Sequence, residues 1–239
     1  MHSTAKMYFK YVLKHPCKSI AVLFKKYPSD IPIRKVLRLL PKNAVIVEAG
    51  AGFGVHTQIF ASTFPLGKII ATEPVPEVFA IAKRKIQDFK NVELLQFALA
   101  ENGLKNLEIL FDATHPHESN SGLEPTKDFF EVYRGVKFPN KIQVDALTLD
   151  QLSAKFEAID LLWLDLQGME YRILSNGGHQ TLKRCHYVHL EVSIKPLYFN
   201  EDDSMQIINF MSAQGFKIIY QALGIAYGNI LWKNESFNK

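Results

Sequence analysis

Residues 44–54 read Ala-Val-Ile-Val-Glu-Ala-Gly-Ala-Gly-Phe-Gly and decide the fold. A short apolar run that ends in a glycine-rich turn is typical of a buried parallel strand. Glycine at positions 50, 52 and 54 lets the main chain turn tightly and lets a ligand approach it. Residues 55–64 have helical character, and the amides that open such a helix can face a carboxylate or a phosphate. The stretch therefore predicts a strand, a ligand-binding turn and a helix.

Strand and helix patterns alternate along the rest of the chain. We expect further strands over residues 68–72, 92–96, 159–164 and 187–191, with helices over 77–89, 169–174 and 205–213. This alternation predicts an α/β fold with a mostly parallel sheet and helices on both faces. Two terminal strands, over 216–220 and 229–232, have no helix between them, so we expect an antiparallel strand pair at the C-terminus.

The segment 107–146 interrupts this pattern. Strand-like runs at 107–111 and 141–146 enclose about 30 mostly polar residues. A connection of this length inside a compact domain is usually functional or mobile, so we interpret the segment as an inserted hairpin with a lid-like loop. His115 and His117 in this loop are candidates for substrate contact. Histidines and acids in a polar loop are usually solvated, and we expect no metal site.

Composition and charge bound the remaining possibilities. The 239 residues contain two cysteines and carry a net charge of +4, but residues 1–26 hold six lysines and no acid, so residues 27–239 sum to −2. We expect a basic helical extension over 1–40 and one domain over 41–239. The lysine face either contacts a membrane or glycan surface or is simply solvated. No signal peptide or membrane span is evident, and we expect a cytoplasmic protein.

Four acids fall at expected strand ends, where open sheets bind their ligands: Glu48, Glu73, Asp165 and Glu191. A carboxylate at position 73, 23 positions after Gly50, can accept both hydroxyls of a ribose, which indicates an adenosine-type ligand. The spacing G-x-G-x-G departs from the dinucleotide fingerprint. Glu48 would repel a pyrophosphate but suits an ammonium group. These features favour S-adenosylmethionine over NAD.

Four segments together resemble the FkbM-type methyltransferases: residues 47–54, 70–76, 97–100, and 147–150 continued by 159–170. The resemblance implies a class I Rossmann-like methyltransferase fold, S-adenosylmethionine as cofactor, and methylation of hydroxyls on glycans or small natural products. It also places Glu48, Gly50, Gly52 and Gly54 at the methionine part, Glu73 at the ribose, and Pro74 and Ala98 near the adenine. The other cofactor contacts that we expect are Ala49, Ala51, Thr57 and Leu99.

Catalysis and substrate binding are less well marked. An alcohol acceptor must lose a proton, and Asp165 is the preferred general base, although it could instead bind cofactor or acceptor. Glu170 is a second catalytic candidate, or a structural partner of the helix that it opens. Trp163 and Gln167, where the family commonly has Lys and Glu, are expected near the substrate together with Glu191.

Three other functions remain open from the sequence. They are a degenerate methyltransferase-fold protein that only binds an adenosine ligand, an NAD-linked reductase, and nucleic-acid methylation. We do not expect a nucleic-acid partner, because the main domain is acidic and the Asn-Pro-Pro-Tyr-type motif is missing. A glycan or small-molecule acceptor is expected, and the sequence does not determine the oligomeric state.

Overall fold

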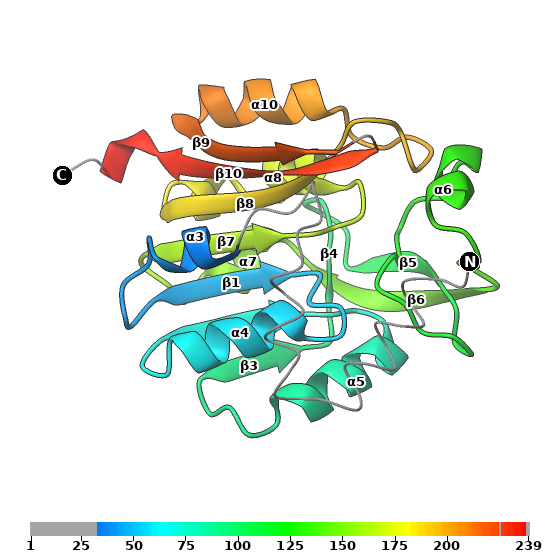
Figure 1. The fold of residues 1–239 in the computed structure, drawn as a ribbon, viewed down its shortest axis with the longest axis horizontal. Helices are drawn as coiled ribbons and strands as arrows, with labels where there is room; N and C mark the ends of the chain where they lie inside the picture. Colours follow the sequence, from blue (N-terminus) through cyan, green and yellow to red (C-terminus); the bar gives the residue numbers. More distant parts are fainter. Residues whose placement is uncertain (1–32, 225, 238–239) are drawn as a thin grey trace.

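A seven-stranded sheet forms the centre of the computed structural model, which describes residues 33–224 and 226–237 (Figure 1). The strand order is β3-β2-β1-β7-β8-β10-β9. The strands are β1 (Val45–Ala49), β2 (Lys68–Thr72), β3 (Val92–Leu95), β7 (Ile159–Leu164), β8 (Cys185–Ser193), β9 (Phe216–Leu223) and β10 (Tyr227–Asn234). Neighbours from β3 to β8 pair in parallel, and β10 is antiparallel to both β8 and β9. The predicted α/β fold and its C-terminal antiparallel pair are confirmed.

The position of β10 could not be read from the strand pattern. β10 lies between β8 and β9, so the last strand of the chain is inside the sheet and β9 forms its edge. The two strands are still joined by a short connection, as expected for an antiparallel pair. Trp232 of β10 is fully buried in the core, which accounts for this inner position.

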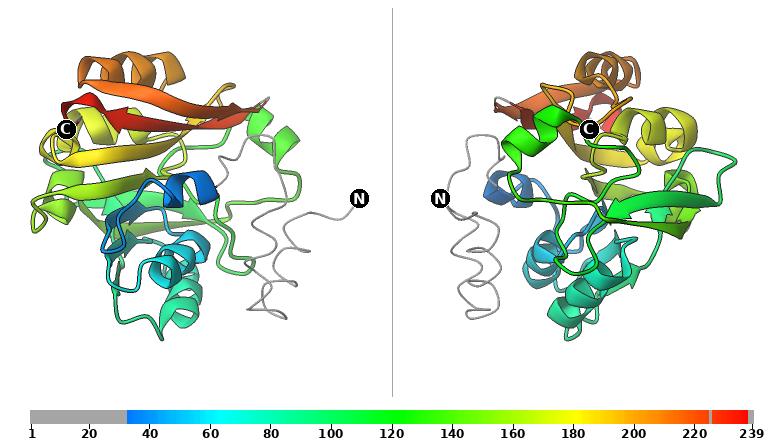
Figure 2. Two further views of the ribbon diagram at one scale, coloured as in Figure 1. Left: turned by 60° about the vertical axis from the view of Figure 1, so that its left-hand side comes forward. Right: turned by 90° about the vertical axis from the view of Figure 1, so that its right-hand side faces the viewer.

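Helices cover both faces of the sheet (Figure 2). Alternate strand residues point to opposite faces, so Ile46 packs under α3 (Ile33–Leu37) and α4 (Val55–Thr63), whereas Val47 packs on the other side. That other side carries α7 (Leu149–Ser153), α8 (Glu170–Gly177), α9 (His179–Leu182) and α10 (Ser204–Ala213). α5 (Pro76–Ile86) packs against α4 and begins with proline in its first turn, where no amide donor is needed.

The inserted segment forms a second, small sheet in the order β4-β6-β5. β5 (Asn106–Phe111) and β6 (Asn140–Leu147) pair antiparallel, as the predicted hairpin requires. Two elements were not predicted: β4 (Ala98–Leu99), which adds to β6 in parallel, and α6 (Lys127–Val132), which lies in the long loop. Both are short, so neither has a recognisable sequence period.

Several expectations concern residues that are not described. Most of the predicted basic helical extension over 1–40 falls within residues 1–32, which lie outside the described part. Of the extension, the structure describes residues 33–40, which include the short helix α3 (Ile33–Leu37). The division at residue 40 therefore stays a prediction. Among the described residues, no helix has the length and apolar character needed to cross a bilayer.

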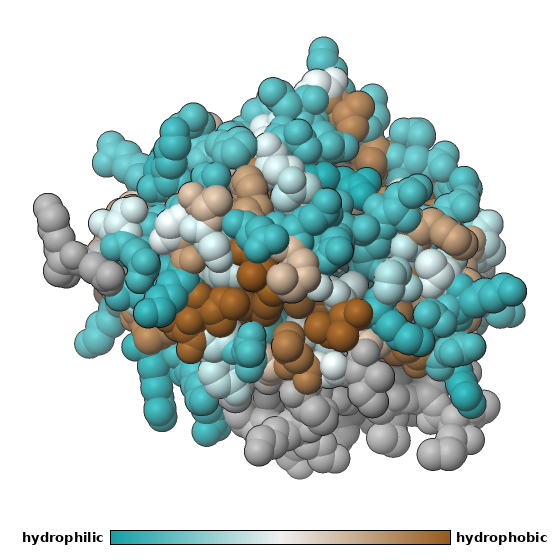
Figure 3. All heavy atoms as spheres, turned by 90° about the horizontal axis from the view of Figure 1, so that it is seen from above, coloured by the Kyte–Doolittle hydropathy of each residue, from teal (hydrophilic) through white to brown (hydrophobic). Residues whose placement is uncertain are grey.

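An apolar band crosses the face of the molecule that is seen from above (Figure 3). On α10 and the edge strand β9, the large apolar side chains that are exposed include Met205, Ile219 and Leu223. None of these three lines the cleft described below.

Candidate active site

Strand register brings distant residues together at the carboxyl ends of four neighbouring strands. Ala49 pairs with Thr72 of β2 and with Leu164 of β7, and Leu164 pairs with Leu190 of β8. The residues that follow these pairs are Gly50, Glu73, Asp165 and Glu191, which therefore form one row. Parallel strands place their carboxyl ends at one edge, which is where ligands bind in open α/β sheets.

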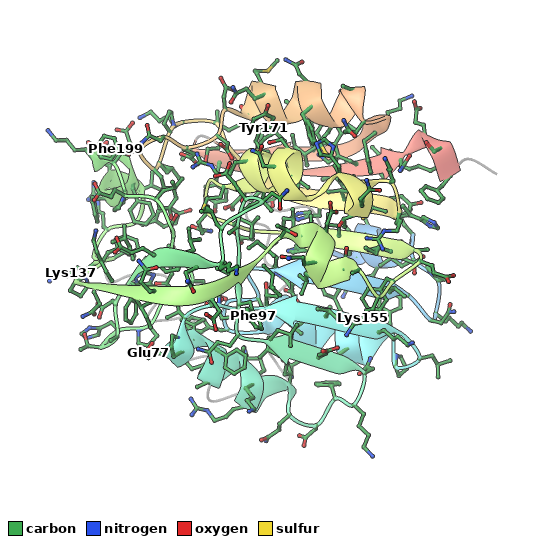
Figure 4. All side chains as sticks on the ribbon, turned by 180° about the vertical axis from the view of Figure 1, so that it is seen from behind. Glu77, Phe97, Lys137, Lys155, Tyr171 and Phe199 are labelled. Carbon is green, nitrogen blue, oxygen red and sulfur yellow. The ribbon has the colours of Figure 1, made fainter. Side chains whose placement is uncertain are left out.

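A cleft opens at this edge. Its walls come from the ends of β1 and β2, the β3–β4 connection, the β7–α8 connection and the inserted loop. Seven of the predicted site residues line it: Gly50, Glu73, Pro74, Ala98, Leu99, Asp165 and Gln167. Phe97, labelled in Figure 4, also lines it near the junction of the two sheets and was not predicted.

The glycine turn, residues 50–54, is held by main-chain hydrogen bonds. The Gly50 and Ala51 amides both donate to the Thr72 carbonyl, at 3.1 and 2.9 Å. Gly50 has φ 81°, and a Cβ there would lie 1.9 Å from the Asp165 carbonyl oxygen. Both the left-handed conformation and the close approach of β7 therefore require glycine at this position.

Glu73 is fixed by two main-chain amides. Its Oε2 accepts from Gly52 N and its Oε1 from Val75 N, each at 3.0 Å. Each carboxylate oxygen has two acceptor positions, so one on each remains for a ligand. Burial raises the pKa of Glu73 to about 8, against the opposing effect of the two amides.

Glu48 lies beneath the glycine turn and does not line the cleft. Its side chain is wholly buried, and Oε2 accepts from the Thr57 hydroxyl of α4 at 2.6 Å, while Oε1 has no partner. Burial raises the pKa of Glu48 to about 8. The even-numbered residues of β1 face α4, so the side chain of Glu48 lies between the strand and the start of that helix, next to the turn. An unpartnered buried carboxylate oxygen is suited to a cation.

Asp165 lines the other side of the cleft, and Glu191 lies beside it on the adjacent strand β8 without lining the cleft. The Gln167 amide Nε2 donates to Asp165 Oδ1 at 2.6 Å and faces Glu191 Oε2 at 3.5 Å. Gln167 Oε1 accepts from the Tyr198 hydroxyl at 2.7 Å. Burial raises the pKa of Asp165, and hydrogen bonds from Gln167 and Glu191 oppose that effect. Tyr198 comes from the β8–α10 loop and has no sequence signal that predicts this contact.

The inserted loop reaches the cleft through residues other than the predicted ones. Glu118 lines the cleft and its Oε1 accepts from the Phe53 amide of the glycine turn at 2.9 Å. His115 is exposed and hydrogen-bonds Thr114, and the ring of His117 packs on Phe138. Neither histidine lines the cleft. The loop therefore reaches the cleft through Glu118 and not through the two histidines, and its role in substrate contact stays a prediction.

The expectation for Trp163 needs correction, and for Glu170 the structure favours one of the two alternatives. Trp163 is 4% exposed and lies under α4, stacked on His189 at 3.5 Å between ring centroids, so it cannot contact a substrate in the cleft. It is an odd-numbered residue of β7, like Leu161, and such residues face α3 and α4. Glu170 is 2% exposed and accepts from the Leu166 amide at 2.7 Å, a contact that holds the β7–α8 turn and favours the structural alternative.

Comparisons with known proteins give relatives in sequence and in fold. The chain is 26% identical over 233 residues to the 2-O-methyltransferase NoeI of Sinorhizobium fredii strain NGR234, covering 93% of each chain. The fold resembles an rRNA methylase from Streptococcus thermophilus, with TM-score 0.51, 11% identity, and coverage of 88% of this chain and 98% of that chain. It also resembles the fibrillarin pre-rRNA processing protein of Methanococcus jannaschii, with TM-score 0.50, 14% identity, and coverage of 82% and 69%.

The family model described as the methyltransferase FkbM domain matches residues 48–218, which begin at Glu48 of β1 and end in β9. The match contains every residue in the row at the strand ends, and it includes the inserted segment. The chain belongs to the FkbM methyltransferase family, and S-adenosylmethionine is its cofactor.

Proposed function

We propose that this methyltransferase transfers the methyl group to a hydroxyl oxygen of a glycan or of a small hydroxylated natural product. The observation that carries the proposal is the row at the strand ends, where the glycine turn and Glu73 lie beside Asp165 and Glu191. One side of this row suits a nucleoside with a charged amino-acid group, and the other supplies carboxylates that can accept a hydroxyl proton. The relative named as a 2-O-methyltransferase supports oxygen as the acceptor atom.

The residues present fit S-adenosylmethionine. Oε1 of Glu48 is buried without a partner beside the glycine turn, and it suits the ammonium of the methionine part. A Cβ at Gly50 would collide with Asp165, so the turn keeps bare main chain at the cleft wall. Glu73 would accept the ribose hydroxyls with its free acceptor positions, and Pro74, Ala98 and Leu99 would contact the adenine. When bound, the cofactor supplies an electrophilic methyl group on a positively charged sulfur.

The remaining residues act on the acceptor. Asp165 would take the hydroxyl proton, because it follows β7 directly and lines the cleft. In-line methyl transfer depends mainly on holding the acceptor oxygen in position, at about 3 Å from the methyl carbon. Gln167 and the inserted loop narrow the cleft on the acceptor side, since Gln167, Asn120 and Ser121 all line it.

Calorimetry with S-adenosylhomocysteine, S-adenosylmethionine and NAD tests the cofactor half of the proposal. We expect binding of the first two compounds and none of NAD. Glu73→Gln should weaken S-adenosylhomocysteine binding by about tenfold or more, because an amide nitrogen would face a main-chain donor at either oxygen position. Glu108→Gln, on an exposed residue outside the cleft, is the matched control.

The acceptor half is tested by transfer of a radiolabelled methyl group from S-adenosylmethionine to panels of oligosaccharides, small alcohols and phenols, amines, and RNA. We expect label in an alkali-stable ether on an oxygen of an oligosaccharide or small alcohol or phenol. Label on nitrogen, or on RNA alone, would contradict the proposal. Cofactor binding without transfer to any acceptor would favour a degenerate binding protein.

A further inference from the structure

The Gln167 amide is oriented by a buried tyrosine. The Tyr198 hydroxyl lies 2.7 Å from Gln167 Oε1 and 3.3 Å from the Ser119 carbonyl, so its single proton goes to the shorter contact. Tyr198 is 3% exposed, and burial raises its pKa well above the usual value, so the hydroxyl keeps its proton. Because Oε1 accepts from this hydroxyl, the Nε2 group must face Asp165 and Glu191.

The backbone at Gln167 is held in an unfavourable conformation that maintains this contact. Gln167 has φ 54°, in the left-handed region that costs a side-chain-bearing residue about 1 kcal/mol. The Ser121 hydroxyl donates to the Gln167 carbonyl at 3.0 Å, and the next residue, Gly168, has no room for a Cβ beside Glu201. Such strain persists only where the surroundings fix it, and it is common at functional sites.

Asp165 and Glu191 are close enough to share one proton. They follow the paired residues Leu164 and Leu190 on adjacent parallel strands. Gln167 Nε2 lies 2.6 Å from Asp165 Oδ1 and 3.5 Å from Glu191 Oε2, so one amide group faces both carboxyl groups. Two carboxylates offer only acceptors and repel each other, so neighbouring carboxyl groups are more stable together when one of them holds a proton. Two carboxyls this close do not both ionise in the ordinary range.

We propose that Asp165 and Glu191 act as one proton-sharing pair that accepts the proton of the acceptor hydroxyl, with Gln167, fixed by Tyr198, as the residue that positions the pair. This inference rests on the proposed oxygen methylation. The acceptor oxygen forms a bond to the methyl carbon, and the carbon–sulfur bond breaks with its electron pair left on sulfur as a neutral thioether. The hydroxyl proton passes to the ionised member of the pair and is later released to water.

The groups that face the pair from other elements are mostly acidic or phenolic. They are Glu48 of β1, Glu73 after β2, Glu118 of the inserted loop, Glu170 of α8, Tyr133 after α6 and Tyr198. Like charges around the pair disfavour its double ionisation. The Gln167 amide opposes this effect, since it donates to the ionised form.

Carboxyl titration by ¹³C NMR tests the pair without an acceptor. The probe is the full chain, with ¹³C in Asp and Glu side chains and with S-adenosylhomocysteine bound. Asp165 and Glu191 signals should respond together in two steps, the upper one above the ordinary carboxyl range. Glu191→Gln should leave Asp165 with a single step at lower pH. A wild-type Asp165 that titrates in one step, unchanged by Glu191→Gln, would overturn the proposal.

The positioning role is tested by Gln167→Met, which keeps the length of the side chain but cannot donate. The upper step should rise by about one pH unit, since a donor to the ionised form is lost. Tyr198→Phe should move it in the same direction by less, while Tyr171→Phe, on a ring that packs against Phe210 away from the pair, should leave it unchanged. A titration that is unchanged in folded Gln167→Met would contradict the role.

The pH profile of methyl transfer separates this inference from the proposed function. With an oxygen acceptor in hand, the rise of kcat should move with the upper step in Gln167→Met while KM for S-adenosylmethionine stays within about twofold. Oxygen methylation whose pH profile is unchanged in Glu191→Gln would overturn the pair and leave the proposed function intact. If the methyl group is transferred to nitrogen, there is no hydroxyl proton for the pair to accept. That result would overturn both the proposed function and the inference about the pair.

Discussion

The β1–β2 side of the cleft is made of main chain, whereas the β7–β8 side is made of side chains. On the first side, the glycine turn, Thr72 and Glu73 are joined by hydrogen bonds that main-chain amides donate. On the second, Asp165, Gln167, Glu191 and Tyr198 come from three separate segments and meet through side-chain hydrogen bonds. A tight main-chain turn accepts few residue types, so it is visible in the sequence as a motif. Contacts between side chains can be made by many residue types, so they leave no recognisable motif.

The largest effect is expected from a substitution in the glycine turn, on the main-chain side of the cleft. Gly50→Ala places a Cβ 1.9 Å from the Asp165 carbonyl oxygen, so β1 and β7 must separate. We expect a loss of more than about 3 kcal/mol in the free energy of unfolding, and loss of S-adenosylhomocysteine binding. Urea unfolding and calorimetry measure the two effects.

Gly103→Ala is the matched control for this variant. Gly103 has φ 91°, close to the 81° of Gly50, but nothing lies within 4 Å of its Cβ position. It should therefore cost only the conformational term of about 1 kcal/mol and leave binding unchanged. Equal losses in the two variants would show that close approach of the strands is not what requires Gly50.

A smaller effect is expected from the buried acid below the turn. The folded-state pKa of Glu48 is about 8 against an ordinary 4.5, so the folded protein holds its proton more tightly than the unfolded chain. The associated stability is fully present below pH 4.5 and is lost as the pH rises through about 8. Glu48→Gln cannot ionise, so it should become increasingly more stable than the wild type as the pH rises from 4.5 to about 8, and it should be nearly equal to the wild type below pH 4.5.

Thermal unfolding as a function of pH measures this difference, with Glu108→Gln on an exposed residue as the control. The two stability curves should diverge as the pH rises. Parallel curves for Glu48→Gln and wild type would mean that Glu48 is ionised in the folded protein at neutral pH. The same variant removes a partner for an ammonium, so S-adenosylhomocysteine should bind it more weakly.

The smallest expected effect concerns the contact between the inserted loop and the glycine turn. Glu118 of the inserted loop accepts from the Phe53 amide, a donor that the carboxylate of the cofactor could otherwise use. Glu118→Ala should free this amide and tighten S-adenosylhomocysteine binding by about threefold. Glu124→Ala, on an exposed residue of the same loop, is the control. Weaker binding in Glu118→Ala would instead indicate that Glu118 holds the cofactor directly.

Much of the fold was predictable because the signals are local. The bounds of β2 and β7 agree with the expected ranges, and the expected hairpin of the insertion is formed by β5 and β6. Apolar runs, glycine turns and proline breaks act within a few residues, so they can be read along the chain. The two-residue β4 has no such signal and exists only because β6 offers it a partner.

The candidate site divides in the same way. Gly50, Glu73 and Asp165 were expected at the cleft edge and lie there, because each directly follows a strand. Trp163 was misplaced because Asp165, two residues later, lies past the end of β7 at the cleft, whereas Trp163 lies within β7 and packs against α4. Glu118 and Tyr198 lie on long connections, whose course depends on what they pack against.

The sequence by itself determined the alternation of strands and helices, the glycine turn, and the acids at the strand ends, because these follow from local conformational preference and from hydrophobic period. Only the tertiary structure decided that β10 enters the sheet beside β8, that Gln167 lies between two carboxyls and a buried tyrosine, and that Glu118 reaches the turn. The contacts of Gln167 with Tyr198 and of Glu118 with Phe53 join residues 31 and 65 positions apart. Strand register and loop packing, which bring such residues together, are properties of the folded chain.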